Sequence, residues 1–110
     1  MLSACDPAPV ELPIADKRAI LRGQAAAQRL GCGACHDMPG VNWPKGTIGP
    51  SLSGFGDRAL IAGKLPNKAP LLADFVRDAR SLVPDSGMPA VPMTENEASD
   101  ISAWLQSLRD

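Results

Sequence analysis

Cys32-Gly33-Ala34-Cys35-His36 is the stretch of sequence that decides the fold. Its two thiols are three positions apart, so each can form a thioether with one of the two vinyl groups on a single porphyrin edge. The imidazole of the histidine that follows can then bind the iron from one face of the ring. The motif therefore predicts one covalently attached haem c, anchored by Cys32 and Cys35 and ligated by His36.

Two other kinds of site use closely spaced cysteines. A structural zinc site needs four Cys or His ligands, whereas this chain has three Cys and one His, and Cys5 is far from the pair. A thioredoxin-like redox pair needs a strand before the motif, within a βαβ unit, but the residues before Cys32 have the pattern of a helix. Both alternatives stay open, and the motif favours haem attachment.

The composition suits a small domain built around a large cofactor. The 110 residues are enough for one hydrophobic core. Aromatic residues make up only 4% of the chain, so a buried macrocycle would supply the interior that large rings usually fill. The net charge is −1 and the sequence has no basic stripe. We therefore expect no nucleic-acid partner.

Residues 1–15 have the features of a leader remnant and a tether. Leu2-Ser3-Ala4-Cys5 resembles the lipobox of bacterial lipoprotein precursors, in which the cysteine becomes acylated. The Pro-rich run that follows would hold a domain away from a surface. Because proteins with the C-x-x-C-H motif receive their haem outside the cytoplasm, we expect a periplasmic protein that a lipidated Cys5 anchors to the membrane. The alternative is a cysteine with no such role.

The predicted domain, residues 16–110, begins and ends with a helix. Asp16 is the expected N-cap of the first helix, which stops at Gly31 just before the cysteine motif. Gly23 lies inside that helix and favours a close contact with another helix, with simple tolerance of the glycine as the alternative. The last helix begins with a capping box, Thr94-Glu95-Asn96-Glu97. Its apolar stripe consists of Ile101, Trp104, Leu105 and Leu108.

The middle of the chain is rich in residues that break regular structure. Residues 37–56 and 81–92 each contain several glycines and prolines, which predicts two long loops. Between them we expect a short helix from Asp57 to Gly63 and a second helix that opens at Pro70. No segment has the pattern of a strand, so the predicted fold class is all-α.

Methionine is the expected ligand on the other face of the iron, because the chain has no second histidine. Met1 belongs to the leader. Met38 follows His36 by two residues, which is too short a connection to reach around the macrocycle. Two candidates are left, Met88 and Met93.

Local sequence favours Met88 over Met93 as the iron ligand. Met93 directly precedes the N-cap Thr94, where an apolar side chain packs back onto the helix as a hydrophobic staple. Met88 lies between Gly87 and Pro89 in a stiff loop, outside any helical stripe; the alternative for it is a loop methionine that fills a gap in the packing. A His36/Met88 pair would raise the reduction potential relative to two imidazoles and leave no open position on the iron.

Residues 16–109 resemble a class I cytochrome c. The resemblance rests on Cys32-Gly33-Ala34-Cys35-His36, Gly49-Pro50-Ser51-Leu52 with Gly54, Pro84 with Met88-Pro89, and Trp104-Leu105. It implies a cytochrome c fold, in which three to five helices surround one covalently bound haem. It also implies that the first and last helices cross, at Gly23 and Trp104.

The resemblance implies roles for three further residues. The carbonyl of Pro50 would accept the N–H of the His36 ring, which fixes the tautomer and strengthens the ligand. Arg58 and Trp43 would reach the haem propionates, with surface or core roles as the alternatives. Trp104 replaces a more usual tyrosine, and Ala27 stands where the family often has an aromatic residue. These departures affect the expected packing but not the expected ligation.

The segment from Ile61 to Asn67 is similar to haem-c domains fused to the copper subunit of some terminal oxidases, and to small bacterial cytochromes that feed such oxidases. We therefore expect a single-electron carrier and not an enzyme. Its redox partner would be a terminal oxidase or another respiratory complex, and the protein would be a monomer or a subunit of a larger complex. The alternative is a haem-c domain with an open or labile sixth site, acting as a sensor or a peroxidase-like enzyme.

Overall fold

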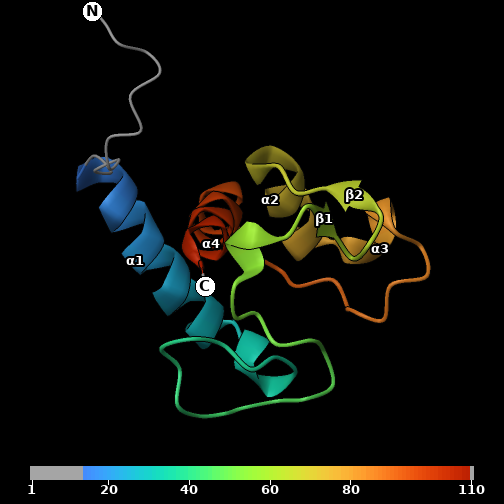
Figure 1. Ribbon diagram of the computed structural model, residues 1–110, viewed down its shortest axis with the longest axis horizontal. Coiled ribbons are helices and arrows are strands. Elements are labelled where there is room, and N and C mark those ends of the chain that lie inside the picture. Colours follow the sequence, from blue (N-terminus) through green and yellow to red (C-terminus); the bar gives the residue numbers. More distant parts are fainter. Residues whose placement is uncertain (1–13, 110) are drawn as a thin grey trace, which may run out of the picture.

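The computed structural model describes residues 14–109 (Figure 1). Its α-helices are α1 (Ile14–Arg29), α2 (Ala69–Arg77), α3 (Ala79–Leu82) and α4 (Glu95–Ser107). Two 3-10 turns, η1 (Cys32–Ala34) and η2 (Phe55–Asp57), and two short strands, β1 (Leu60–Ile61) and β2 (Leu65–Pro66), complete the elements. Long loops, residues 35–54 and 83–94, join them. The all-α fold class is therefore confirmed, apart from one small hairpin.

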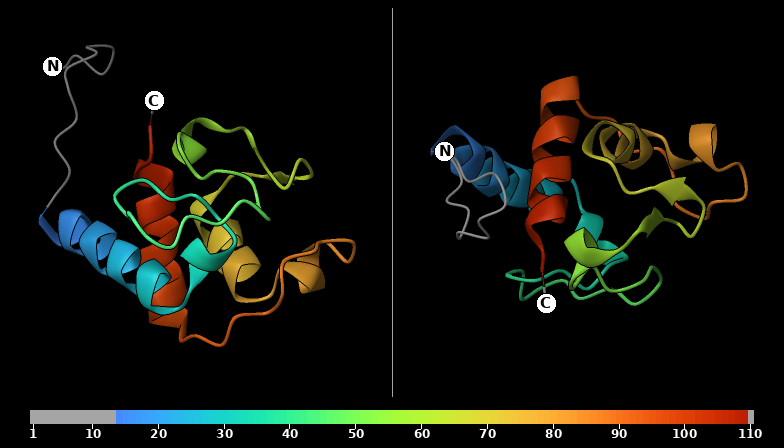
Figure 2. Two further views of the ribbon diagram at one scale, coloured as in Figure 1. Left: turned by 90° about the horizontal axis from the view of Figure 1, so that it is seen from below. Right: turned by 45° about the horizontal axis from the view of Figure 1, so that its top comes forward.

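Helices α1 and α4 cross in direct contact, and α4 lies between α1 and α2 (Figure 2). The crossing point is Gly23, because a Cβ atom at this position would lie 1.9 Å from the carbonyl oxygen of Asp100 and 2.9 Å from the Cβ of Trp104. Only glycine allows two helix backbones to approach so closely. The predicted crossing at Gly23 and Trp104 is thus confirmed.

Ion pairs flank the crossing on the solvent side. Arg22 Nε lies 2.9 Å from Asp100 Oδ2, and Arg29 pairs with Glu97. Each pair joins α1 to α4. Exposed pairs of this kind contribute little to stability, so the apolar contact beneath them is the main attachment.

The start of α4 is the capping box that the sequence predicts. Glu97 N donates to Thr94 Oγ1 at 3.1 Å, and Thr94 N donates to Glu97 Oε1 at 2.8 Å. Behind the cap, three residues of the predicted stripe are buried: Ile101, Trp104 and Leu105. They pack against α1 on one side and against the buried residues Leu72, Phe75 and Val76 of α2 on the other.

The start of α1 differs from the prediction. The helix begins at Ile14, so Asp16 lies in its first turn and is not the N-cap. A carboxylate in the first turn is favourable beside the positive end of the helix dipole. Aspartate therefore suits the first turn as well as the N-cap position. The proposed tether and the acylated Cys5 lie outside the described residues.

The short helix predicted from Asp57 to Gly63 is wrong. The segment is the 3-10 turn η2 followed by an antiparallel hairpin, in which Leu60 pairs with Pro66 and Ile61 with Leu65. At the hairpin turn Ala62 and Gly63 have φ of 54° and 70°. Both angles lie in the left-handed region, which is incompatible with a right-handed helix and allows a tight reversal.

The boundaries of α2 and α3 refine the prediction for the next segment. Pro70 lies in the first turn of α2, as expected, since α2 begins at Ala69. The predicted loop of residues 81–92 starts later than expected, because the short helix α3 extends to Leu82. Ala79, at the start of α3, is completely buried and fixes this helix against the core.

The hairpin and η2 are fastened to the end of α4. Gly56 N donates to Leu108 O at 2.7 Å. Asn67, just after β2, donates through Nδ2 to Arg58 O at 2.9 Å and accepts from Gln106 Nε2 at 2.8 Å. These bonds fix the segment that carries Arg58, one of the predicted site residues.

Candidate functional site

The cysteine motif forms a tight turn directly after α1. Gly31 has a φ of 84°, a left-handed conformation that ends the helix. The turn is closed by two bonds to one carbonyl: Cys35 N and His36 N both donate to Cys32 O, at 3.2 and 3.0 Å. Residues three apart on a 3-10 turn lie on the same side. The two cysteines therefore share the spacing and the side that a single porphyrin edge requires.

Both cysteines of the motif are free and partly buried. Burial raises the pKa of the Cys32 thiol above its ordinary value, and the neighbouring Cys35 adds to the increase. The Cys32 thiol is therefore neutral near pH 7. Reactive dithiols of the thioredoxin type need the opposite, a lowered pKa, so this environment argues against that alternative.

His36 is oriented by the loop that follows the motif. Its Nδ1 lies 2.7 Å from Pro50 O. Because a carbonyl oxygen can only accept, Nδ1 carries the proton, and in the neutral ring Nε2 keeps its lone pair. A bond of this kind fixes the ring of a metal-binding histidine and makes it a better ligand. The arrangement leaves Nε2 as the metal-binding atom.

Gly49 packs against the same ring. A Cβ atom at this position would lie 2.4 Å from Cε1 and 2.7 Å from Nδ1 of His36. Gly49 N also donates to Cys35 O at 2.7 Å. The role of Gly49 has only a weak signal in the sequence, which is the density of glycine in this loop.

The rest of this loop is bound to the motif by its backbone. Gly46 N donates to Gly33 O at 2.8 Å, and Leu52 N donates to Asp37 O at 2.9 Å. A Cβ atom on Gly46 would lie 2.3 Å from Ala34 O, so this contact also requires glycine. The loop and the motif form one connected unit that surrounds His36.

Arg58 supports the loop from outside. Its Nη2 donates to Ser51 O at 2.6 Å, directly after Pro50. Its guanidinium carbon lies 5.1 Å from the centre of the Phe55 ring. Trp43 is 81% exposed and lies on the same loop as Pro50. The contacts predicted between these two side chains and haem propionates stay predictions.

The three methionines within residues 14–109 differ in burial. Met38 is 2% exposed and belongs to the core, which gives it a structural role on the histidine side. Met88 and Met93 are both partly buried against the core. Met93 also lines a shallow hollow beside α2 and α3. The choice of Met88 as ligand therefore stays a prediction.

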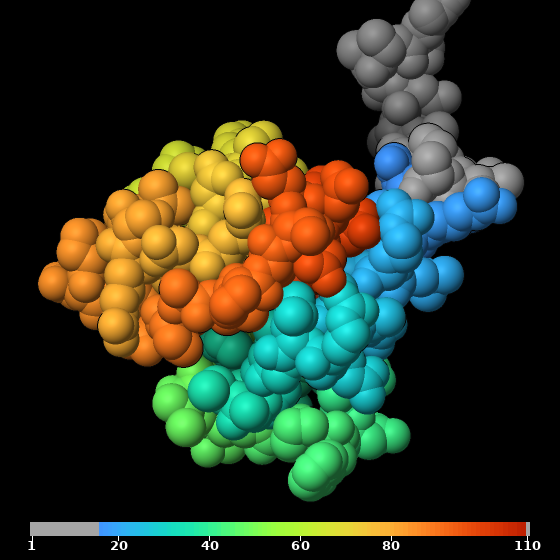
Figure 3. Space-filling view, turned by 180° about the vertical axis from the view of Figure 1, so that it is seen from behind, coloured from blue at the N-terminus to red at the C-terminus, as the bar shows by residue number. Residues whose placement is uncertain are grey.

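The loop with Pro50 and the loop with Met88 lie on one face of the molecule. Figure 3 shows residues 37–54, in teal and green, below residues 83–94, in orange. The first loop holds the ring of His36 through Pro50 O, and the second contains the neutral thioether sulfur of Met88. The donor atoms on this face, together with the paired thiols of η1, fit a covalently attached haem.

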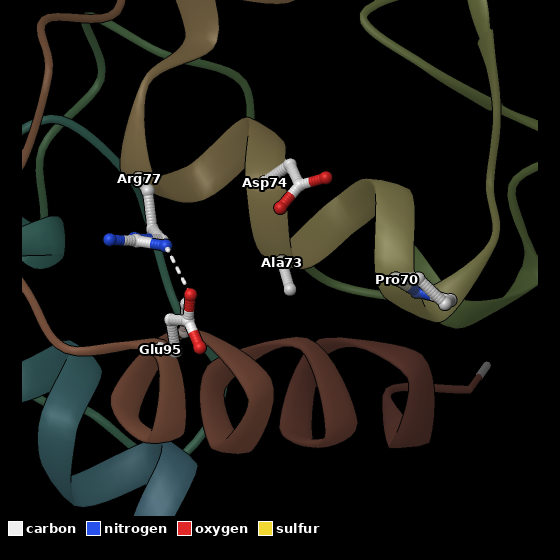
Figure 4. A pocket seen from close by; sticks show the side chains of 6 residues that line it. Pro70, Ala73, Asp74, Arg77 and Glu95 are labelled. Carbon is white, nitrogen blue, oxygen red and sulfur yellow. Dashed lines mark ion pairs between the residues drawn. The ribbon is translucent and has the colours of Figure 1, made fainter.

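A separate shallow pocket of about 250 Å³ lies between α2 and α4 (Figure 4). It is lined by Pro70, Ala73, Asp74, Arg77, Glu95 and Ala98. Arg77 and Glu95 face each other across it at 3.9 Å. None of the predicted haem-binding residues lines this pocket.

Two further findings concern residues 14–109 only. No group of three His, Cys, Asp or Glu side chains among them is arranged to hold a metal ion. No helix in this part of the chain has the length and hydropathy needed to cross a membrane.

Comparison with known proteins identifies the family. The profile of the family described as Cytochrome c matches residues 20–109. The chain belongs to the cytochrome c family. This cytochrome c domain contains the whole of the site described above, and its family membership implies haem binding and haem-based electron transfer.

One relative is a cytochrome c oxidase subunit 2 from Alkalihalophilus pseudofirmus. It is 36% identical to this chain over 89 residues, which are 80% of the chain and 25% of the relative. The chain thus spans about a quarter of the length of that protein. The predicted similarity to haem-c domains of oxidase subunits is confirmed.

Proposed function

We propose that this cytochrome c domain is a single-electron carrier with one haem c, bound covalently through Cys32 and Cys35 and ligated by His36 and Met88. The observation that carries the proposal is the 2.7 Å contact between His36 Nδ1 and Pro50 O. It leaves Nε2 free one residue after the second cysteine of a C-x-x-C pair. A histidine held in this way has the form of an iron ligand.

The bound haem would supply the iron, which exchanges one electron between its ferric and ferrous states. The chain sets the conditions for that exchange. Pro50 holds the His36 ring in one tautomer, and Gly49 limits its rotation. The neutral sulfur of Met88 favours the ferrous state. With both faces ligated, an electron can be gained or lost with little change of geometry, and no position is open for a substrate.

We further propose that the electron passes to or from a membrane respiratory complex, such as a terminal oxidase, on the periplasmic side. The 36% identical oxidase subunit supports a partner of this kind. Anchoring through a lipidated Cys5 would keep the domain near such a complex. A reduced preparation should then be oxidised by membranes that contain a terminal oxidase, and the oxidation should stop when that oxidase is inhibited.

The ligand assignment is tested with Met88→Ala and Met93→Ala, each produced in a host that attaches haem c. We expect Met88→Ala to lose the weak far-red absorption of sulfur-bound ferric haem, to have a lower reduction potential and to bind cyanide or carbon monoxide. Met93→Ala should keep the far-red band. The opposite result, with the band lost only in Met93→Ala, would make Met93 the ligand. A high-spin spectrum in the unmodified protein would instead favour the sensor or peroxidase-like alternative.

A further inference from the structure

Ser86 fastens the loop that carries Met88 with all three of its polar groups. Its Oγ accepts a hydrogen bond from Met88 N at 3.2 Å, and its own N donates to Val83 O at 2.9 Å. Its carbonyl oxygen accepts from Arg80 Nε at 3.1 Å. The backbone two residues before the sulfur-bearing side chain is therefore bound from three directions.

Arg80 links this loop to the hydrophobic core. It lies on α3, between two buried residues, Ala79 and Val83, which are 0% and 5% exposed. A second attachment lies on the other side of Met88, where Val91 N donates to Arg77 O at 3.0 Å. Met88 is thus carried on a short span between Ser86 and Val91, and both ends are bound to the helical segment 77–83.

We propose that Arg80 and Ser86 are positioning residues for the iron ligand Met88, and that their hydrogen bonds set how readily its sulfur leaves the iron. The proposal rests on the proposed ligation by Met88. For the sulfur to move away, the span that carries it has to shift. Hydrogen bonds that exist only in the closed loop lower the population of the open form, because opening breaks them.

Binding of imidazole to the ferric protein measures this opening, since an external ligand reaches the iron only when the sulfur has left. The apparent affinity for imidazole equals the intrinsic affinity of the open form multiplied by the fraction of protein that is open, which is small. Loss of one hydrogen bond of ordinary strength should therefore increase the apparent affinity roughly fivefold, within a range of about twofold to tenfold. The far-red band should weaken but persist.

Ser86→Ala and Arg80→Ala are the test variants. Ser81→Ala is the matched control, because Ser81 lies on the same short helix and its Oγ donates to Asp78 O at 2.8 Å and not to the Met88 loop. We expect the first two variants to bind imidazole more tightly and to have a lower reduction potential, with Ser81→Ala unchanged in both. Arg80→Lys keeps a donor for Ser86 O and should lie closer to the unmodified protein than Arg80→Ala.

The Met88→Ala variant separates failure of this inference from failure of the proposed ligation. If Met88→Ala abolishes the far-red band while Ser86→Ala and Arg80→Ala bind imidazole like the unmodified protein, the positioning role is wrong and the ligation stands. If Met88→Ala keeps the band, the ligation is wrong and the inference falls with it. Equal losses of melting temperature in Ser86→Ala and Ser81→Ala, without any difference in imidazole affinity, would also overturn the inference, since they would indicate a merely structural contribution.

Discussion

The His36 ring lies directly on the backbone of Gly49, so that a Cβ atom at position 49 would be 2.4 Å from its Cε1. The next residue, Pro50, accepts the hydrogen bond from Nδ1 of the same ring. Two consecutive residues of one loop therefore fix the position and, in the neutral ring, the tautomer of the proposed iron ligand. The Gly-Pro pair is a support for the histidine as well as a turn.

Gly49→Ala should displace the His36 ring. A methyl group at 2.4–2.9 Å from three ring atoms cannot fit without movement, and overlap of this kind costs roughly 1–3 kcal/mol of unfolding free energy. We expect a lower yield of haem-containing protein and a changed reduction potential in the fraction that forms. Potentiometric titration would measure this. Thr47→Ala, at an exposed position of the same loop, is the control, and equal behaviour of the two variants would refute the steric role.

Gly23→Ala should destabilise the protein although alanine is the better helix former. The gain in helix propensity is about 1 kcal/mol, whereas a Cβ atom 1.9 Å from Asp100 O forces the two helices apart. Overpacking of this kind costs roughly 1–3 kcal/mol and the gain in propensity offsets about 1 kcal/mol of it, so we expect a net loss of up to about 2 kcal/mol in denaturant unfolding. Ala25→Gly, at an exposed position of the same helix, is the reciprocal control and should lose about 1 kcal/mol from propensity alone. A stabilised Gly23→Ala protein would mean that the crossing is looser than described.

The Glu97 carboxylate makes the free energy of unfolding depend on pH in the acidic range. The bond from Thr94 N, followed by the pair with Arg29, holds the pKa of the Glu97 carboxyl below its ordinary value of 4.5. A carboxyl whose pKa is lowered by folding stabilises the folded state above that ordinary value, and the contribution is lost as the pH falls through the lowered pKa. Urea unfolding of Glu97→Gln should therefore depend less steeply on pH below about 4.5 than unfolding of the unmodified protein.

Glu95→Gln is the control for this pH dependence, because Glu95 lies on the exposed first turn of the same helix and its side chain is 89% exposed. Because exposed ion pairs contribute little to stability, loss of its pair with Arg77 should change the acid slope less than Glu97→Gln does. If Glu97→Gln shows the same slope as Glu95→Gln, the capping contact does not carry the acid sensitivity.

The start of α4 and the close contact at the helix crossing could be predicted because each depends on a residue pattern that has one common structural role. Thr94 and Glu97 form a reciprocal cap that involves only local spacing. Gly23 is costly within a helix unless a close neighbour requires it, and the backbone of Asp100 is that neighbour. The capping box and the need for a close neighbour at Gly23 are visible in the sequence itself, whereas the identity of that neighbour, the last helix, followed from the resemblance to class I cytochromes c.

The hairpin could not be predicted because its turn uses an unusual residue. Alanine rarely adopts a positive φ, and turns with two such residues normally carry Asn-Gly or Asp-Gly. Here the pair is Ala62-Gly63, so the short apolar run before it has the pattern of a helix that ends at glycine. The strands are only two residues long, which leaves no alternation to detect.

The histidine side of the site could be predicted in more detail than the methionine side. The cysteine motif and His36 follow from local spacing, and the resemblance to class I cytochromes c supplied Pro50, fourteen residues away in the chain. Residues whose side chains bind the backbone of a loop have no such signal. Ser86 and Arg80 bind the Met88 loop through contacts that depend on the fold of α3, so the sequence analysis missed them.

Covalent attachment of haem is the central claim, and one measurement tests it most directly. The protein is expressed in a host that attaches haem c, extracted with acidified acetone, and examined by intact mass and by absorption. The account predicts a Soret band that stays with the polypeptide and a mass increased by one haem, both lost in the Cys32→Ser/Cys35→Ser variant. A colourless polypeptide of unmodified mass, from a host that loads a known cytochrome c in parallel, would contradict it.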